Sequence, residues 1–555
     1  MIRHKKNSKW ILALVVAIMP MIFSNHLINA QESSGSSSRQ RVTFNKDIAP
    51  IVHQKCASCH RPGQAGPFSL ITFKDVARRA RTIDAVIDSN YMPPWKPVNH
   101  NVEFVNDRRL SKNEKQLIKS WIDAGKPRGD GVEPTPPEFK DDWRLGKPDL
   151  IVPMNGEFEV PASGRDIYRS FVFPLQLNED KWIKAIEYRP TATSSVHHGL
   201  FLTDTTGNAR RMDGQDGKPG ISGMSFLVGT SNQNQEESSG QDAAQTPPIT
   251  RLMTQMRQVN SGAIEPPFTK ALGSGLGAYV PGAIPVRLPN DLAMKLPAGS
   301  DIVMQTHFHP SGKSELEKGQ LAIYFSDKQP SQELVQIQVP AAFGVGKGLK
   351  IPAGDANYVM SESYTTPTDI QLVSVGAHAH YICRKVSMIA KLPSGEQTVL
   401  LQIDDWDLDW QDRYYFKKRI VLPAGSVITT KLVYDNTDEN LENPNHPPQE
   451  IRWGRESGDE MGSASIQVIA VDERERSKLQ KSLRKYLLAS VMQGDLMELL
   501  MQLDTNRDGG LQPDEAPPQM QQRFNLLDRN QDGMLAPEEL EVIRRFFPGS
   551  NRANR

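Results

Sequence analysis

The stretch Ile302-Val-Met-Gln-Thr-His-Phe308 has the composition of a β-strand, because β-branched and aromatic residues lie between turn-forming Pro, Gly and Asp. Ile370-Gln-Leu-Val-Ser-Val375 has the same character. Short runs of this kind recur from about Lys147 to Val471, where amphipathic helical runs are nearly absent. Because about 320 residues exceed one sandwich, the pattern predicts two antiparallel β-sandwich domains, at 147–330 and 335–472.

Two further features organise this β-rich region. The boundary between the two predicted domains falls near Gln329 to Pro340. A polar stretch from about Thr205 to Pro266, rich in Gly, Gln and Ser, interrupts the first domain. A stretch of this length and composition predicts an inserted loop, and it contains no residues to which we assign a chemical role.

The region on the N-terminal side, from about Arg41 to Asp130, has a helical period instead. Ser111 and Glu114 form a capping box at the start of one predicted helix, and Gly125 ends that helix. We therefore expect a small all-α domain over 41–130. The apolar residues of its other predicted helix recur every three or four positions: Phe73, Val76, Ala80, Ile83, Val86 and Ile87.

The overall composition excludes several classes of protein. The chain has 555 residues, of which 65 are basic and 65 acidic, so its formal charge is zero. A neutral chain lacks the basic field that nucleic-acid and membrane-surface proteins use, so no nucleic-acid partner is expected. Three cysteines are too few for a disulfide framework.

The first thirty residues predict a secretory signal peptide. Basic residues from Arg3 to Lys9 precede an apolar run from Trp10 to Phe23, and small Ala30 closes the segment. An uncleaved anchor stays open as an alternative. No second apolar run is long enough to span a bilayer, so we expect a periplasmic or secreted protein without a membrane span after cleavage. The Ser-rich stretch Gln31 to Gln40 predicts a flexible linker.

Cys56-Ala-Ser-Cys59-His60 is the attachment pattern of a covalent c-type haem. The two thiols add to the haem vinyl groups, and the adjacent His supplies an axial ligand to iron. A zinc or redox pair is the alternative, but no second Cys pair is present to complete a zinc site. The stretch through Tyr91-Met-Pro-Pro-Trp95 resembles the cytochrome c domains of exported bacterial multidomain proteins. That resemblance implies Met92 as the distal ligand, with His53 or His100 as alternatives.

Six of the twelve histidines occur as three close pairs within the β-rich region. Alternate residues of a strand share one face, so the two His of a His-x-His pair can bind one metal ion. Neutral imidazoles favour Cu, Zn, Fe or Ni. Chance pairing of exposed histidines is the alternative. The pairs are His197-His198, His307-Phe-His309 and His378-Ala-His380.

These motifs, in this order, resemble the copper type II, ascorbate-dependent monooxygenases, a family that includes peptidylglycine α-hydroxylating and dopamine β-monooxygenases. The matching segments are Val196-His-His-Gly-Leu-Phe-Leu202, Met304-Gln-Thr-His-Phe308 and Gly376-Ala-His-Ala-His380. The resemblance implies an electron-storing copper held by His197, His198 and His307. It also implies an oxygen-activating copper, the catalytic one, held by His378, His380 and a downstream Met, for which Met461 is the best candidate.

The resemblance covers roughly Lys147 to Val471 and implies two jelly-roll-like sandwiches with copper facing the cleft between them. The chain departs from the animal enzymes of the family, which have several disulfides, because this region contains only Cys383. His309 has no role in the implied ligand sets. The substrate-recognition residues of the family do not map onto this chain, so the substrate, a small molecule or a peptide, stays open.

Two acidic loops near the C-terminus match the twelve-residue calcium loop of EF-hands. Side-chain oxygens at positions 1, 3 and 5, a backbone carbonyl at position 7 and a bidentate Glu at position 12 bind the ion. Leu511 and Leu535 occupy position 8, where paired loops form a short ladder. We expect an α-helical EF-hand pair over 485–548 that binds structural calcium, two ions in all. The ligands are Asp504, Asn506, Asp508, Gly510 and Glu515, and Asp528, Asn530, Asp532, Met534 and Glu539.

The sequence thus predicts a multidomain oxidoreductase with a haem c, two copper ions and calcium. The leading hypothesis is a copper monooxygenase that hydroxylates a C–H bond with O2 and receives electrons from an external donor through its own haem. A non-enzymatic haem and copper protein of the cell envelope, for electron transfer or copper binding, is the alternative. A calcium-dependent scaffold is a third hypothesis, which the ordered histidines disfavour.

Overall fold

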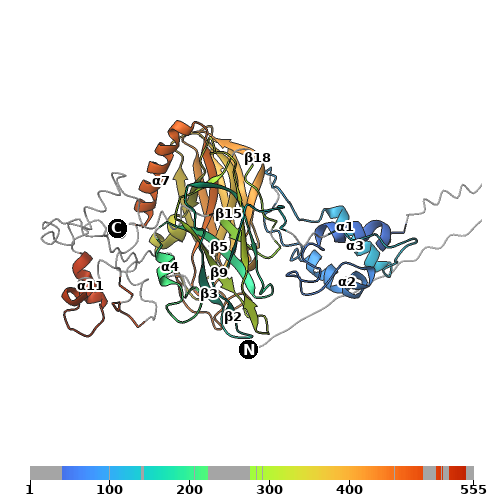
Figure 1. Ribbon diagram of the computed structural model, residues 1–555, viewed down its shortest axis with the longest axis horizontal. Coiled ribbons are helices and arrows are strands. Elements are labelled where there is room, and N and C mark those ends of the chain that lie inside the picture. Colours follow the sequence, from blue (N-terminus) through green and yellow to red (C-terminus); the bar gives the residue numbers. More distant parts are fainter. Residues whose placement is uncertain are drawn as a thin grey trace, which may run out of the picture. The chain divides into compact units, whose positions relative to one another are not determined.

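The computed structural model describes residues 41–98, 101–138, 143–205, 207–222, 276–282, 284–289, 292–454, 457–491, 508–513, 515–516 and 524–544. The predicted signal peptide, the linker 31–40, His100 and most of the predicted loop 205–266 lie outside these ranges. The chain divides into Met1–Arg41 and Val42–Arg555, and the second unit is described below. It is mostly β-structure (Figure 1).

The N-terminal part of this unit is helical, as expected. Its elements are η1 (Phe44–Ile48), α1 (Ala49–Lys55), α2 (Phe73–Asp88) and α3 (Lys112–Asp123). The predicted capping box is present, since Ser111 Oγ accepts the N–H of Glu114 and Glu114 Oε2 accepts the N–H of Ser111. The apolar face of α2 is buried through Val76, Ala80, Ile83 and Ile87. This face packs with α1 and α3 around Trp121 in a core of its own.

The strands of the 147–330 region form two larger sheets and one ribbon, and every pairing between these strands is antiparallel. A four-stranded sheet has the order β1 (Leu150–Pro153), β11 (Gln320–Phe325), β4 (Lys181–Arg189), β8 (Met294–Leu296). A five-stranded sheet has the order β6 (Ile221–Ser222), β3 (Ile167–Phe173), β9 (Asp301–Phe308), β5 (Val196–Asp204), β7 (Gly277–Tyr279). The ribbon pairs β10 (Glu315–Glu317) with β2 (Phe158–Val160).

Two details differ from the expectations for this region. The strand β9 is longer by one residue than the stretch that predicted it, and all eight of its residues are buried. The first part of the predicted loop is folded, because it contains the helix α4 (Asn208–Met212) and the strand β6. Arg169 from β3 holds this folded part of the predicted loop, because its guanidinium pairs with Asp216 and donates to the carbonyl of Lys218.

The strands of the 335–472 region also form two larger sheets and one ribbon. One sheet has the order β12 (Val335–Val339), β21 (Gly462–Ala470), β15 (Ile370–Ala379), β18 (Arg413–Leu422). The other has the order β14 (Tyr358–Thr365), β19 (Val427–Tyr434), β16 (Cys383–Lys391), β17 (Gln397–Ile403). The ribbon pairs β13 (Lys350–Ile351) with β20 (Ile451–Arg452), and the short helices η3 (Ala341–Lys347) and η4 (Leu408–Trp410) lie in connections.

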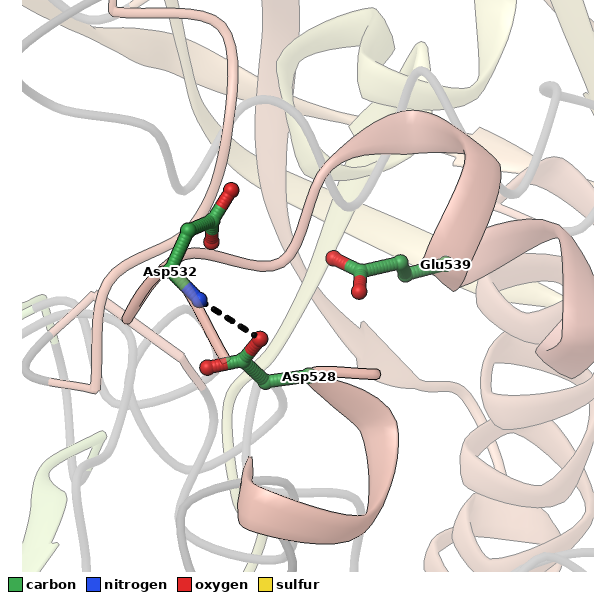
Figure 2. A group of neighbouring side chains, drawn as sticks. All are labelled: Asp528, Asp532 and Glu539. Atoms are coloured by element: carbon green, nitrogen blue, oxygen red, sulfur yellow. Dashed lines mark hydrogen bonds between the residues drawn. The ribbon is translucent and has the colours of Figure 1, made fainter. Parts of the chain in front are cut away.

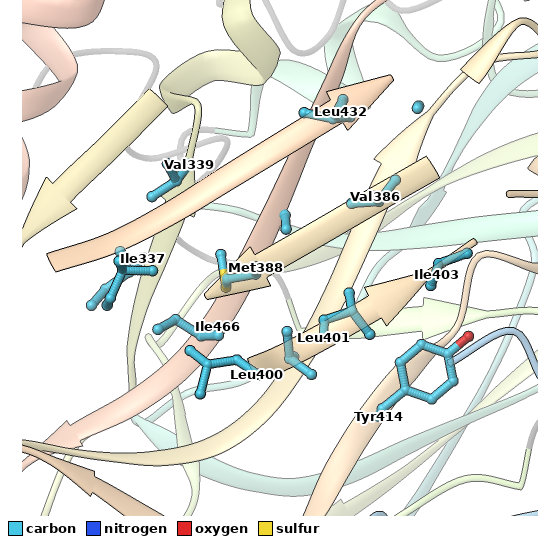
Figure 3. Packing of buried hydrophobic residues seen from close by; sticks show 14 of the residues in the cluster. Ile337, Val339, Val386, Met388, Leu400, Leu401, Ile403, Tyr414, Leu432 and Ile466 are labelled. Atoms are coloured by element: carbon cyan, nitrogen blue, oxygen red, sulfur yellow. The ribbon is translucent and has the colours of Figure 1, made fainter. Parts of the chain in front are cut away.

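Apolar residues from both larger sheets of this region share one core (Figure 3). Ile337 and Ile466 come from the first sheet, and Met388 and Leu432 come from the second. Cys383 is fully buried in the same core, as expected for a thiol without a disulfide partner. The two larger sheets of this region therefore enclose one apolar core between them.

The C-terminal part is again helical in its described residues. η5 (Glu473–Glu475) leads into α7 (Arg476–Val491), and α10 (Phe524–Leu527) and α11 (Pro537–Arg544) flank the second acidic loop. Leu511 and Leu535 form the expected antiparallel bridge, with N–H to carbonyl distances of 3.1 and 2.8 Å. In the described ranges, no helix is long and apolar enough to cross a membrane.

The fold class predicted from the sequence is wrong. A jelly roll places eight strands in two four-stranded sheets. Here the strands form six separate sheets: the four sheets of four or five strands, in a propeller-like arrangement, and the two ribbons. The prediction failed because periodicity identifies strands but not their partners. β1 and β11, for example, pair across about 170 residues of sequence.

The predicted cytochrome c domain and EF-hand pair are also not identified as folds. The haem-attachment pattern specifies a few residues and leaves the path of the surrounding chain undetermined. Of the four helices that an EF-hand pair needs, the described residues contain α10, with four residues, and α11, with eight. A calcium-loop motif specifies ligand oxygens, whereas the flanking helices depend on packing.

Candidate functional site

Two neighbouring strands bring the first group of predicted ligands together. His197 and His198 lie on β5 and His307 lies on β9, where His198 pairs directly with His307. The Nδ1 atoms of His198 and His307 are 3.4 Å apart. A register shift between Val196 and His198 allows both His197 and His198 to lie near His307. The ring centroids of His197 and His307 are 5.3 Å apart. The sequence-predicted trio is therefore clustered.

Asp166, just before β3, holds this cluster in place. Its Oδ2 accepts hydrogen bonds from His307 Nε2 at 2.9 Å and from the Tyr381 hydroxyl at 2.9 Å, and its Oδ1 accepts one from His309 Nδ1 at 2.8 Å. Burial raises the pKa of Asp166, but the hydrogen bonds and the charge of His307 outweigh burial and lower the pKa strongly. Asp166 is therefore a carboxylate. Because it accepts a hydrogen bond from the Nε2–H of His307, Nδ1 of that ring remains for a metal ion.

His197 has a different carboxylate neighbour. Its Nδ1 lies 3.0 Å from Asp409 Oδ1, a residue of η4. Both atoms are buried without a well-aligned hydrogen bond, although the charges are close enough to interact. Burial lowers the pKa of His197, but Asp409 and Asp166 outweigh burial and raise it above the ordinary value. Because a raised pKa favours the protonated ring, a metal ion at Nδ1 of His197 would have to displace that proton.

The second group of predicted ligands lies at the end of β15. His378 Nδ1 donates to Gln411 Oε1 at 2.6 Å, and His380 Nδ1 donates to the carbonyl of Asp459 at 3.1 Å. The amide of Gln411 is itself oriented, because its Nε2 donates to the carbonyl of Leu408. Both histidines therefore keep Nε2 without a proton. The two rings are perpendicular with centroids 5.3 Å apart, so both Nε2 atoms are candidates to bind one ion.

Burial keeps these two rings neutral. It lowers the pKa of His378 to about 4 and, together with repulsion from His378, that of His380 to about 3. Burial also lowers the pKa of His198, with further repulsion from His307, His378 and His380. The two histidine groups therefore lie close enough to influence each other. Neutral imidazole is the form that binds a transition metal.

Met461 lies beside His380 in the structure. Ala379 pairs with Gly462 in the antiparallel register of β15 and β21. The next pair in this register would place Met461 opposite His380. One buried oxygen, Oε1 of Glu460, accepts the N–H groups of both His380 and Met461, at 2.7 and 2.8 Å. Met461 is 2% exposed. The backbone thus supports the predicted grouping of His378, His380 and Met461.

Aromatic side chains pack against both histidine groups. The ring of Tyr168 stacks on His307 with a centroid distance of 4.4 Å and an interplanar angle of 4°. Phe343 meets His378 edge-on at 5.1 Å. Phe343 and its neighbour Ala342 have positive φ angles of 53° and 46°, which are uncommon for residues with a side chain. The chain therefore accepts backbone strain where Phe343 packs against His378.

The haem-attachment residues follow α1. His60 Nδ1 donates to the carbonyl of Phe68 at 3.1 Å, so Nε2 remains for iron, and burial lowers the pKa of His60. Cys56 and Cys59 are free thiols, and burial and Cys59 raise the pKa of Cys56 to about 12. This donor set fits a covalent haem with His60 as an axial ligand.

The predicted distal ligand is less tightly defined. Met92 is half-buried after α2, and its N–H donates to the carbonyl of Val86 at 2.9 Å. The alternative His53 is buried, and its Nε2 donates to the carbonyl of Ile71 at 3.0 Å. This hydrogen bond occupies the ring nitrogen that a histidine would most often offer to iron. Met92 therefore remains the better candidate.

The second acidic loop brings three predicted calcium ligands together (Figure 2). Oxygens of Asp528, Asp532 and Glu539 all lie within 4.8 Å of one another. In the part of the chain that the structure describes, this is the one group of three His, Cys, Asp or Glu side chains with such close ligand atoms. The ligand atoms of His197, His198 and His307 are therefore farther apart than those of this acidic group. Gly533, at position 6, has the expected positive φ of 84°.

The first acidic loop is described only in part. Asp504 and Asn506 lie outside the described residues. Asp508 Oδ1 accepts the N–H of Gly510 at 3.2 Å, and Glu515 Oε2 accepts the N–H of Gln512 at 3.2 Å. Gly509 has the expected positive φ of 95°. In its described residues, the first loop thus has the same positive φ at position 6 as the second loop.

Several residues at the histidine groups could not be identified from the sequence. Asp166, Tyr381, Asp409, Gln411 and Glu460 occur outside any recognised motif. Asp166, Asp409, Gln411 and Glu460 each contact a histidine from a segment distant in sequence. Tyr381 acts through Asp166, which accepts its hydroxyl. Glu460 and Tyr381 are also sequence neighbours of predicted ligands. Only these two neighbours offered a local signal.

No protein-family model matches the chain, and no curated protein matches its sequence. Solved structures give weak matches. PNGF-II is 9% identical, with a TM-score of 0.23, over 58% of this chain and 65% of that one. A Paenibacillus xanthan lyase is 10% identical, with a TM-score of 0.15, over 61% of this chain and 28% of the lyase. The infectious bursal disease virus VP2 subviral particle is 8% identical, with a TM-score of 0.16, over 62% and 77%. Such low scores carry no argument about fold or function.

Proposed function

We propose that the protein is a copper-dependent monooxygenase that hydroxylates a substrate C–H bond with O2 and receives electrons through a covalently bound haem c. The observation that carries the proposal is the pattern of ring nitrogens. In each of His307, His378 and His380, one ring N–H donates a hydrogen bond to an acceptor of the chain, and the other ring nitrogen is left for a metal ion. This pattern is typical of metal-binding histidines.

Bound copper would supply one-electron storage at one site and reaction with O2 at the other. The storage site is assigned to His197, His198 and His307. Asp166 holds His307 in the tautomer that presents Nδ1, and Tyr168 restrains the ring by stacking. Asp166 also keeps a negative charge beside the cluster, which favours a cation.

The oxygen site is assigned to His378, His380 and Met461. Gln411 and the carbonyl of Asp459 orient the two imidazoles. Glu460 fixes the backbone of His380 and Met461, and the Tyr434 hydroxyl donates to the carbonyl of Met461 at 3.4 Å. A thioether beside two imidazoles favours the reduced copper ion. Phe343 contacts the ring of His378 edge-on and restrains it by packing.

The haem is assigned to Cys56, Cys59 and His60, with Met92 as the distal ligand. His60 is oriented by the carbonyl of Phe68, and its lowered pKa favours the neutral ligand form. A thioether as the distal ligand raises the haem potential and suits electron transfer. The acidic loops, with Asp528, Asp532 and Glu539, are proposed to bind structural calcium.

Metal content and O2 consumption test this function together. The purified holoprotein should contain two copper ions and one haem iron per chain, and it should consume O2 only with a reductant. His307→Ala should lower the copper content to about one ion per chain and abolish sustained O2 uptake. A holoprotein with two copper ions and no reductant-dependent O2 uptake would favour the non-enzymatic copper or electron-transfer protein instead.

A further inference from the structure

Residues 404–412, which connect β17 and β18, are unusually acidic. In this subsection, the acidic loop means this connection and not the calcium loops near the C-terminus. It includes the short helix η4. Two of its residues contact the histidine groups: Asp409 lies 3.0 Å from His197, and Gln411 accepts the hydrogen bond of His378. One short loop therefore touches both proposed copper sites. Its aspartates are Asp404, Asp405, Asp407, Asp409 and Asp412.

Three further aspartates of the loop pair with basic residues that follow Met92 in the chain. Lys96 Nζ lies 3.1 Å from Asp405 and 3.1 Å from Asp407, and its side chain is only 7% exposed. Arg108 Nη2 lies 2.9 Å from Asp412 Oδ2, with both side chains largely buried. The side chain of Asp405 is 66% exposed, so the pairs of Lys96 with Asp407 and of Arg108 with Asp412 are the partly buried ones, which salt and water screen less.

Arg108 also contacts the chain beside Met92 and a residue of the β-rich region that packs against Cys59. Its Nε donates to the carbonyl of Pro94, two residues after Met92, at 3.2 Å. Its Nη1 donates to the carbonyl of Gly282 at 3.0 Å. Gly282, with a φ of 75°, leaves room for Cys59, because a Cβ at this position would lie 2.5 Å from Cys59 Sγ.

Packing reinforces these charged contacts. Trp95 belongs to the core of the 335–472 region and meets Tyr414 edge-on, with ring centroids 5.1 Å apart. The N–H of Val98 donates to the carbonyl of Gln402, directly before the acidic loop, at 2.7 Å. Cys59 and Asp412 also line the same cavity of about 320 Å³. The haem-attachment region and the acidic loop are thus held together at several points.

We propose that the acidic loop docks the haem-attachment region, through Lys96 and Arg108, against both histidine groups, so that the haem reduces copper directly within one chain. This inference rests on the proposed function. In the step, ferrous haem iron loses one electron and becomes ferric. Cu(II) at His197, His198 and His307 gains that electron and becomes Cu(I), and no bond forms or breaks. No diffusible carrier is needed between the two centres.

The rate of haem oxidation tests the docking. The holoprotein is reduced anaerobically at the haem and mixed with Cu(II), and oxidation of the haem is followed by its absorbance. For a direct transfer, the limiting rate is independent of protein concentration. Arg108→Gln and Asp412→Asn should each slow the transfer about tenfold, and the double variant should be no slower than either single one. Additive effects or unchanged rates would overturn the proposal.

A second ion pair, close in sequence to Arg108 and Asp412, provides a matched control. Lys417 and Glu103 form an ion pair at 3.4 Å that is exposed on both sides and lies outside the acidic loop. Lys417→Met should leave the transfer rate unchanged. An equal loss of rate in this control would mean that Arg108 acts only through general stability. The haem spectrum of each variant checks that the haem environment is intact.

A second measurement does not depend on bound metal. A zero-length carbodiimide should cross-link Lys96 to Asp405 or Asp407 in the protein without copper, and 1 M salt should reduce the yield. The absence of this cross-link would overturn the docking even if the copper chemistry were correct. Conversely, a protein that forms the cross-link but binds no copper would refute the proposed function and leave the docking surface in place.

Discussion

The Nδ1 atoms of His198 and His307 face each other at 3.4 Å across the paired strands β5 and β9. Since the Nε2–H of His307 donates a hydrogen bond to the carboxylate of Asp166, Nδ1 of His307 has a lone pair that points at His198. Either a proton on His198 Nδ1 or a metal ion can occupy the space between the two nitrogens. Protons and metal therefore compete at this point, and metal affinity should fall as the pH decreases.

Asp166→Asn tests whether the carboxylate positions His307. The amide cannot serve the three donors that Asp166 accepts, and it removes the negative charge beside the cluster. Copper affinity of the storage site should fall by roughly 10- to 100-fold, as for other groups that orient a metal ligand. Copper titration measures the loss. Asp355→Asn, in an exposed turn, should leave the affinity unchanged; an equal loss there would contradict the role of Asp166.

Met461→Leu tests the thioether while keeping the side-chain volume. The swap should cost less than about 1.5 kcal/mol of stability, but it removes the soft ligand of the oxygen site. We expect weaker binding of Cu(I), measured by competition with a chelator, and a sharp decrease in O2 uptake. Met388→Leu, at a fully buried core position, is the control and should retain both properties. Unchanged Cu(I) binding in Met461→Leu would exclude Met461 as a ligand.

Cys59→Ala tests the attachment of the haem. One thioether bond at most can then form, through Cys56, so stable haem-containing protein should be largely lost. Denaturing electrophoresis with haem staining, together with the haem spectrum, measures the outcome. Cys383→Ala is the control, since Cys383 is buried far along the chain in the core of the 335–472 region. A full covalent haem spectrum in Cys59→Ala would refute the assignment.

Glu539→Gln tests the proposed calcium loop. The carboxylate closes the group with Asp528 and Asp532, and its Oε1 accepts the N–H of Arg529 at 2.7 Å. Removing its charge should lower calcium affinity at least about tenfold. Calorimetric titration of the metal-depleted protein measures this affinity. The neighbouring Glu538 is exposed and outside the group, so Glu538→Gln should bind calcium normally; a similar loss in both variants would argue against the site.

Glu317 predicts a pH dependence of folding. Burial raises its pKa above the ordinary 4.5, although hydrogen bonds from Tyr188 and three backbone N–H groups act in the opposite direction. A raised pKa in the folded state means that stability is fully present below the unfolded value and decreases as the pH rises above about 4.5. Glu317→Gln should be less stable throughout but should show a weaker decrease with pH. Urea unfolding at several pH values measures both effects, and an unchanged slope would contradict the role of Glu317.

The local elements were largely predictable from the sequence. The capping box of Ser111 and Glu114, the buried face of α2 and the strand β9 all lie where the patterns indicate. The same holds for the pairing of Leu511 with Leu535. These features depend on residues within a few positions of one another, or on a motif with fixed spacing.

The sequence by itself determined which residues we propose as carriers of the chemistry: the three histidine pairs, the Cys56 to His60 motif and the calcium loops near the C-terminus. Only the tertiary structure decided how strands combine into six small sheets, and hence that the expected jelly rolls do not form. It also decided that Asp166 meets His307, that Asp409 meets His197 and that Arg108 meets Asp412. These contacts join residues more than 130 positions apart. Long-range pairing of this kind is selected by the packing and hydrogen bonding of the whole chain, which no local pattern of residues contains.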